Sequence, residues 1–236
     1  MHSASLHSAI VKKIIPIVYE DDAICIVNKP YGLSVQGGAQ VSTCLTDILK
    51  VQLGTDIFPV HRLDKETAGL LITAKTAAAA RSCRELFDSQ TVQKEYLAFC
   101  FRSSKSTGEL SGTVVTPIKE NGIEKPASTT YRIIAGGEDY CLFSAIPHTG
   151  RMHQIRIHLA GIGYPLIGDD KHGDFRLNKA LWKSARIKKL QLCAFRLQLP
   201  IRGRPRRFTV PIPEHIRSAL MALLEDTGII QQLETY

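Results

Sequence analysis

Three polar side chains that could do chemistry, His61, Arg62 and Asp64, lie within four consecutive positions of the segment VHRLDKETAGLLITAK (residues 60–75). A carboxylate among cationic groups is held in its ionised form. An ionised and oriented carboxylate can act as a nucleophile. The same aspartate could instead close a turn ahead of the apolar run that follows. Spacing alone leaves both interpretations open.

Two further groups of candidate residues follow along the chain. One is the segment GRMHQIRIH at 150–158, and the other is Tyr96 within KEY. Arg151 and Arg156 could form a structural pair on a helix surface, and Tyr96 in an alternating strand could belong to the core. The sequence offers no second carboxylate in a context like that of Asp64, although ordinary glycoside cleavage uses two.

Several common kinds of site lack their sequence signatures. The chain contains no phosphate-binding P-loop, no glycine-rich dinucleotide fingerprint, no GxSxG elbow and no HExxH or deaminase zinc motif. Metal-dependent hydrolysis, dinucleotide redox chemistry and base deamination are therefore left without the ligands they require.

The elements that must position these residues are predicted as strands and a few helices. Residues 69–74 form an apolar run of strand length, and residues 76–90 are typical of a helix. Ile155, Leu159 and Ile162 follow helical spacing, with Gly163 in position to end that helix. The other predicted strands are 14–19, 23–28, 93–101, 111–116, 128–134, 140–146, 190–199 and 206–210, and the other predicted helices are 43–53, with Ser42 as a possible N-cap, and 214–225.

This order of elements favours an α+β fold. Strand runs joined by short turns, with helices inserted, predict a mixed and mainly antiparallel central sheet with flanking helices and loops. We expect residues 1–12 to be a flexible tail and 13–236 to form a single domain.

The charge distribution and the cysteines limit which partners and which cellular compartment are expected. The chain carries a net charge of +8, but residues 171–207 contain twelve Lys and Arg against one acid, which gives that region +11. Positive charge gathered in one region is typical of a polyanion partner, although a solvated basic face would look the same. The six cysteines form no CxxC pair, and we find no membrane-spanning run or signal peptide. We therefore expect a cytoplasmic protein that binds RNA or DNA, with no metal and no membrane contact.

Four ordered motifs resemble one known family. HRLDKETAGLLITAK is similar to the HRLDxxTSG…AK signature of the RluA family of pseudouridine synthases, with Ala68 where the family often has Ser. NKPYG at 28–32, KEY at 94–96 and TGRMHQIRIHLAGIGYPLIGD at 149–169 follow the family's order. The resemblance covers residues 14–212 and implies the pseudouridine synthase fold. The motifs begin too early for the S4-type RNA-binding domain that many members carry, so we expect a stand-alone catalytic domain.

The resemblance implies a role for each candidate. Asp64 would be the catalytic aspartate, Arg156 would hold it ionised, and Tyr96 would pack on the target base and take its C5 proton. Arg62 would fill the gap left by the flipped base, while Ile155 would pack on the base from the other side. His61, Arg151 and Gln154 are the further expected RNA contacts.

The implied reaction is the isomerisation of a uridine in ribosomal RNA of the large subunit, in transfer RNA, or in both. Arg62 and Asp64 are two residues apart in an extended stretch, so they point to the same side of the backbone, where one can enter the RNA stack and the other can meet the flipped base. No cofactor is expected, and we expect a monomer. The alternatives are a catalytically silent RNA-binding or ribosome-assembly protein of the same fold and, more distantly, a glycosylase that acts on DNA.

Overall fold

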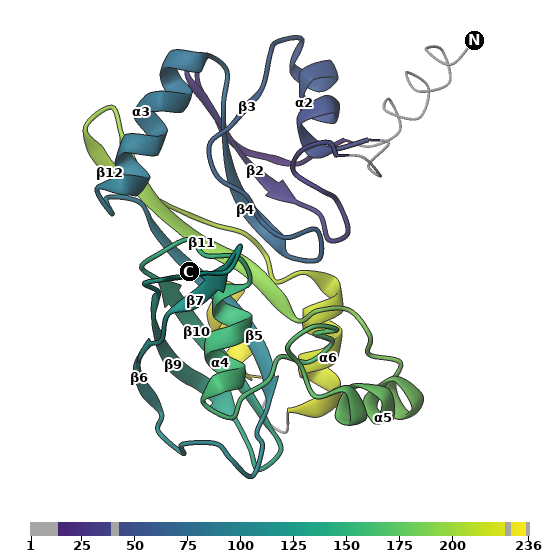
Figure 1. Cartoon of the computed structure of the whole chain (residues 1–236). Helices are drawn as coiled ribbons and strands as arrows, with labels where there is room; N and C mark the ends of the chain where they lie inside the picture. Colours follow the sequence, from purple (N-terminus) through teal and green to yellow (C-terminus); the bar gives the residue numbers. More distant parts are fainter. Residues whose placement is uncertain (1–13, 39–42, 225–227, 235–236) are drawn as a thin grey trace. The chain divides into compact units, whose positions relative to one another are not determined.

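The computed structural model describes residues 14–38, 43–224 and 228–234, which form two compact units. Unit 1 comprises the chain up to Val92 together with Gln198–Val210, and unit 2 comprises Gln93–Leu197 and the chain from Pro211 onward. Figure 1 follows the chain through both units. The predicted tail, residues 1–12, lies outside the described residues, and the prediction of a single domain stays a prediction.

Within the described residues, unit 1 is built on antiparallel strands with two helices. β2 (Ile24–Lys29) pairs with β1 (Ile17–Glu20) and with β4 (Ala68–Ala74), and the short β3 (Phe58–Pro59) also pairs with β4. The last residues of β11 (Leu192–Ile201) and β12 (Arg204–Thr209) complete its strands. In the β2–β4 register Lys29 lies opposite Gly69, so the end of β2 adjoins the start of the strand that follows Asp64.

The two helices described in unit 1 were predicted from the sequence, but only one of them has the predicted N-cap residue. α3 (Ala77–Asp88) begins at the predicted place, where the Thr76 hydroxyl accepts a hydrogen bond from the Ala79 N–H at 3.1 Å. α2 (Leu45–Leu53) is also present, but its N-cap residue is Cys44 and the prediction of Ser42 as the cap is wrong. The Cys44 N–H donates to the Asp47 carboxylate at 3.1 Å, so a side chain inside the helix satisfies the cap residue. Ser42 itself lies outside the described residues.

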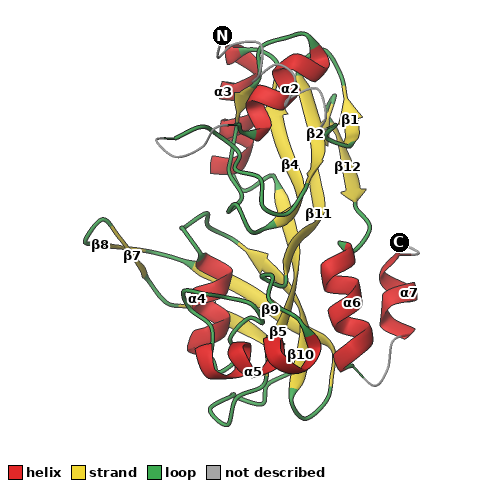
Figure 2. Cartoon of the chain, turned by 90° about the vertical axis from the view of Figure 1, so that its right-hand side faces the viewer, coloured by secondary structure: helices red, strands yellow, loops and turns green. Residues whose placement is uncertain are grey.

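Unit 2 holds antiparallel strands covered by helices on both sides. β10 (Tyr140–Pro147) pairs with β5 (Gln93–Phe101) and with β9 (Ser128–Gly136), and β6 (Ser111–Val115) pairs with β9. Figure 2 shows α4 (Gln154–Gly161) on one side of these strands and α6 (Glu214–Leu223) with α7 (Gly228–Glu234) on the other. The mainly antiparallel strands with flanking helices confirm the predicted α+β class.

Some elements of unit 2 were missed by the sequence analysis. They are the hairpin of β7 (Ile118–Glu120) and β8 (Ile123–Lys125), and the helices α5 (Phe175–Ala185) and α7. In α5, Leu177 and Leu181 face inward, but Phe175 and Trp182 lie on the opposite side, and these exposed aromatic residues obscure the apolar stripe in the sequence. The predicted helix after residue 153 is confirmed as α4, and Gly163 follows it with a φ of 87°, as a residue that ends a helix requires.

Candidate active site

The predicted site residues fall into two groups, one in each unit, and each group is described by itself. Unit 1 contains His61, Arg62 and Asp64. Unit 2 contains Tyr96 and the residues of and before α4.

Asp64 lies in a tight turn immediately before β4. The Thr67 N–H donates to the Asp64 backbone carbonyl at 3.1 Å, so the backbone closes this turn. The Asp64 side chain is half-buried and Arg62 is exposed. The turn that was the alternative interpretation of Asp64 is therefore present. It places the aspartate just before the first residue of β4, which is buried along its whole length.

A buried lysine anchors the turn that carries Asp64. Lys29 is 0% exposed, and its Nζ donates to the carbonyl oxygens of Leu33 (2.8 Å), Pro30 (3.1 Å) and Lys65 (3.2 Å). The Gly32 N–H also donates to the Lys65 carbonyl, at 2.8 Å. Lys29 thus holds the NKPYG loop against the residue that follows Asp64.

Replacing Lys29 by methionine is expected to lower the free energy of unfolding by about 3 kcal/mol, because buried carbonyl groups lose a charged donor. Urea unfolding measures the change. Lys65→Met is the matched control, because the Lys65 side chain is exposed and only its carbonyl is used. Equal stability of the two variants would contradict the anchoring role.

His61 has a structural contact at the same strand. Its Nε2 accepts a hydrogen bond from the Ile72 N–H at 3.0 Å, and its ring centroid lies 4.7 Å from that of Phe87. An accepting Nε2 requires the neutral ring. The histidine therefore braces the segment before Asp64 against β4 and α3, and its expected contact with RNA stays a prediction.

Tyr96 and α4 lie on the same face of the unit 2 strands. Tyr96 pairs across β5 and β10 with Ala145, and Ala145 pairs across β10 and β9 with Tyr131, so the three side chains share a face. Thr129, two residues before Tyr131, is on that face too, and Gln154 and His158 of α4 hydrogen-bond to it. Tyr96 is 8% exposed, which also fits the alternative that it belongs to the core.

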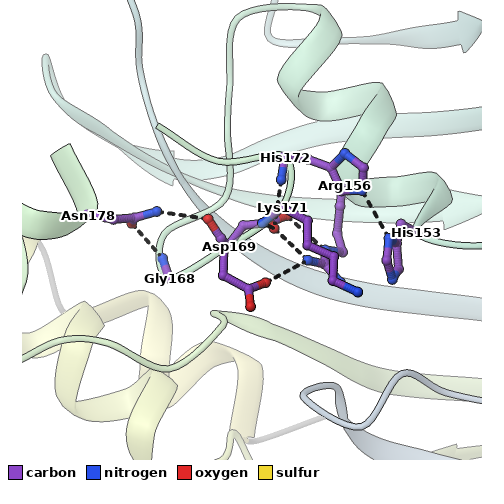
Figure 3. Close-up of polar contacts among 8 residues, drawn as sticks. His153, Arg156, Gly168, Asp169, Lys171, His172 and Asn178 are labelled. Carbon is purple, nitrogen blue, oxygen red and sulfur yellow. Dashed lines mark hydrogen bonds and ion pairs between the residues drawn. The ribbon is translucent and has the colours of Figure 1, made fainter. Parts of the chain in front are cut away.

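Arg156 forms a buried ion pair with Asp169 (Figure 3). Its Nε donates to Asp169 Oδ2 at 2.8 Å and its Nη2 donates to Oδ1 at 2.5 Å, a fork-like geometry that fixes the guanidinium plane. Arg156 is 2% exposed and Asp169 is 1% exposed. The adjacent Asp170, whose side chain is 80% exposed, is 3.5 Å from the same Nη2. Asp169 therefore orients the arginine that the resemblance assigns to catalysis.

The environment of Asp169 favours its ionised form. Burial by itself raises the pKa of Asp169, but hydrogen bonds from Arg156 and from the backbone N–H groups of His172 and Lys171 outweigh it, so the pKa lies below its ordinary value. The two N–H groups donate to Oδ1 at 3.0 and 2.9 Å. The pair is thus a carboxylate and a guanidinium at neutral pH.

The loop that carries Asp169 is itself fixed on both sides. Asn178 of α5 accepts from the Gly168 N–H at 2.8 Å and donates to the Asp169 carbonyl at 3.0 Å. Gly168 has a φ of 75°, and a Cβ there would lie 2.1 Å from the Lys189 carbonyl oxygen, so only glycine fits. The His153 and His172 rings are hydrogen-bonded at 2.9 Å, which ties the far end of the loop to the start of α4.

Gln154 and Arg151 make contacts within unit 2. Gln154 is 4% exposed, and its amide donates to the Ser128 carbonyl (2.9 Å) and to the Thr129 hydroxyl (3.0 Å), while its oxygen accepts from the Arg151 N–H (3.1 Å). The Arg151 Nε donates to the Pro126 carbonyl at 3.1 Å. These bonds hold the loop before α4 on β9. Contacts of the two side chains with RNA stay predictions, as does that of Ile155, which is 6% exposed.

His158 extends the same network and is held neutral. Its Nε2–H donates to the Thr116 carbonyl at 2.9 Å, so its Nδ1 accepts from the Thr129 hydroxyl at 2.9 Å. Burial lowers the pKa of His158 below its ordinary 6.5, and the bond to Thr116 opposes this only in part.

The lowered pKa of His158 predicts a loss of stability in mild acid. Below about pH 6.5 the unfolded chain takes up a proton that the folded chain resists, so stability is complete above that pH and falls as pH drops through it, by up to about 1.4 kcal/mol per pH unit. His158→Gln should reduce this slope in urea unfolding between about pH 7.5 and 5.5. His148→Gln, at an exposed histidine, is the control. An unchanged slope for His158→Gln would contradict the assignment.

Two residues of these groups, Lys29 and Asp169, were not recognised from the sequence. Both lie in strings that carry the family resemblance, NKPYG and PLIGD, which is the one signal that could have found them. Among the described residues no group of three or more His, Cys, Asp or Glu is placed to hold a metal ion. Nor is any helix in that part of the chain both long and apolar enough to cross a membrane.

Comparison with known proteins points to one family. Residues 23–161 match the family described as RNA pseudouridylate synthase. The chain is 37% identical over 174 residues to the ribosomal large subunit pseudouridine synthase C of Rickettsia bellii, covering 68% of this chain and 58% of that protein. It is 34% identical over 224 residues to the protein of the same name from Pasteurella multocida, covering 89% of this chain and 68% of that one.

A solved structure matches over nearly the whole chain. The structure of human RNA pseudouridylate synthase domain containing 4 superposes with a TM-score of 0.75 at 27% identity, covering 93% of this chain and 95% of that one. The predicted fold is thereby confirmed.

Proposed function

Because this chain belongs to the RNA pseudouridylate synthase family, we propose that it isomerises a specific uridine in RNA to pseudouridine. In this reaction the bond between N1 of uracil and C1′ of ribose breaks, and a bond between C5 and C1′ forms. C5 loses its proton and N1 gains one, so the atoms balance without an added reactant.

Asp64 is the proposed catalytic residue. Its carboxylate attacks the target uridine at C1′ or at C6, or assists a glycal route, and the detached uracil rotates before it rejoins the ribose. The observation that carries this proposal is the placement of Asp64 in a backbone-closed turn anchored by the buried Lys29. A nucleophile must be held close to its reacting geometry, and such a turn limits its motion.

The unit 2 residues are proposed to bind and orient the target base. Arg156, with its plane fixed by Asp169, keeps the catalytic carboxylate ionised, and Tyr96 stacks on the base and receives the C5 proton. Arg62, which belongs to unit 1, is proposed to replace the base in the RNA stack, which offsets part of the few kcal/mol that flipping costs. Ile155, on the same helix as Arg156, packs against the base from the other side.

Ribosomal RNA of the large subunit is the proposed substrate, with transfer RNA as the second candidate. The support is that both curated relatives described above carry the name ribosomal large subunit pseudouridine synthase C. Their name says nothing about which uridine this chain selects. We further propose that the protein acts in the cytoplasm, a setting consistent with six cysteines that are all buried and that form no disulfide bond among the described residues. A monomeric state stays a prediction.

RNA labelled with tritium at uridine C5 tests the proposal. Ribosomal and transfer RNA are incubated separately with the protein, and released tritium, pseudouridine and free uracil are measured. Isomerisation predicts tritium release with an equal yield of pseudouridine and no free uracil. Free uracil with an abasic site would indicate a glycosylase. RNA binding without tritium release from either RNA would favour the catalytically silent alternative.

A further inference from the structure

Helix α5 presents aromatic and cationic side chains together on one exposed face. Phe175, Lys179, Trp182 and Arg186 recur at steps of four, three and four residues, which places them on one side of the helix and its C-cap. Phe175 is 63% exposed and Trp182 is 41% exposed. Lys179 and Arg186 are exposed as well. Two aromatic side chains interleaved with two cations on one exposed helix face form a surface suited to a ligand with both aromatic and anionic parts.

The opposite side of α5 explains why this face is not a packing face. Leu181 is 6% exposed and Leu177 is half-buried, so these two leucines attach the helix to unit 2. Asn178 adds the hydrogen bonds to Gly168 and Asp169. Figure 1 draws α5 at the outer edge of the unit. The helix is therefore held by one side, and its aromatic face is turned to solvent.

The charge of the face suits a polyanion. Residues 171–189 contain seven Lys and Arg and one acid. That acid, Asp174, caps the helix by accepting from the Leu177 N–H at 2.9 Å. The guanidinium of Arg186 lies 5.3 Å from the centre of the Trp182 ring, and the Lys188 Nζ lies 5.8 Å from it. Two cationic groups that can bind phosphates therefore lie beside the indole.

From this face we infer that α5 is a docking surface for unpaired nucleotides of the substrate RNA, at positions other than the target uridine. Aromatic rings bind RNA by stacking on bases, and only unpaired bases offer their faces, whereas cations track the backbone. An anionic membrane surface would be the other polyanion, but it favours a continuous apolar face. Here a lysine separates the two aromatic residues.

The surface is linked to the proposed site through one side chain. Asn178 lies on α5, where it accepts a hydrogen bond from the Gly168 N–H and donates one to the Asp169 carbonyl. The Asp169 carboxylate in turn holds Arg156. An RNA strand bound on α5 would therefore be held next to the loop that orients this arginine. The inference rests on the proposed function, because its ligand is the RNA that carries the target uridine.

Trp182 is the only tryptophan in the chain, so its fluorescence reports directly on α5. The full chain is titrated with a single-stranded RNA of about twelve nucleotides made only of A and C, which cannot be a substrate. We expect saturable quenching that weakens with salt, about 0.7 log units per log unit of salt for each phosphate contact. The same strand in a duplex with complementary DNA should quench much less.

Matched variants separate stacking from charge. Lys183 is a further exposed lysine of α5, one turn beyond Lys179. Lys179→Gln with Lys183→Gln keeps the helix and the tryptophan, and should reduce the salt slope and weaken quenching several-fold. Phe175→Ala should weaken binding by about fivefold or more, the loss expected for one stacked base. The control, Lys105→Gln with Leu110→Ala, removes an exposed cation and an exposed apolar side chain elsewhere in unit 2. It should change neither the salt slope nor the affinity for the strand.

The outcomes distinguish this inference from the proposed function. The inference is overturned if fluorescence anisotropy shows that the strand binds while the fluorescence of Trp182 stays unquenched. It is also overturned if phosphatidylserine vesicles quench Trp182 and the strand does not. If the α5 variants raise the KM for ribosomal RNA while kcat stays near that of the unmodified chain, it is supported. Quenching by the A and C strand, combined with no tritium release from labelled ribosomal or transfer RNA, would support the docking surface and refute the isomerase.

Discussion

Replacing Asp64 by asparagine should reduce tritium release by at least about 10³-fold, to the level of the reaction without protein. Asparagine has nearly the same shape, but it lacks the charge and the nucleophilic oxygen. The turn should survive, because the Thr67 N–H bonds to the Asp64 backbone carbonyl. Quenching of Trp182 by the A and C strand should also survive, since α5 is unchanged.

The control for this experiment is Asp22→Asn, which removes an exposed carboxylate from the same unit and should retain full activity. Urea unfolding and circular dichroism establish that both variants are folded. Appreciable pseudouridine formation by a folded Asp64→Asn protein would refute the proposed role of this residue. It would also shift attention to other groups near the target base.

Removing the Asp169 carboxylate should produce the largest loss of stability. Asp169→Ala leaves the guanidinium of Arg156 buried without its fork-like partner, and breaking a buried pair in this way costs about 3–5 kcal/mol. Asp170→Ala is a closely matched control, because that exposed carboxylate is 3.5 Å from the same arginine and should cost less than about 1 kcal/mol. Urea unfolding at neutral pH measures both.

A double-mutant cycle tests whether the cost belongs to the pair. Arg156→Met combined with Asp169→Ala removes both charges and should destabilise less than the sum of the two single changes, with a coupling of about 1–3 kcal/mol. Because the pKa of Asp169 is lowered in the folded chain, its contribution is present above the ordinary carboxyl range and is lost as pH falls through the folded value. Additive single effects would show that Asp169 does not stabilise the fold through Arg156.

Local sequence signals predicted most elements because those signals act over a few residues. The Thr76 cap and the alanine-rich run that follows it determine α3, and runs rich in β-branched and aromatic residues between turn residues determine β5, β9 and β10. The prediction failed at α5, where Leu177 and Leu181 face inward but two further apolar residues, Phe175 and Trp182, lie on the opposite, exposed side. The exposed aromatic residues therefore obscured, in the sequence, the regular inward face of this helix.

By itself the sequence determined the family, the α+β class and the identity of the residues around Asp64, Tyr96 and Arg156, because ordered motifs and local periodicity are written along the chain. Only the tertiary structure decided which groups those residues meet. Lys29 reaches the carbonyl of Lys65, 36 residues away, and Arg156 meets Asp169 rather than a neighbour on its own helix. Such partners depend on how loops distant in sequence approach one another, and a buried charge is satisfied only where that approach supplies a partner.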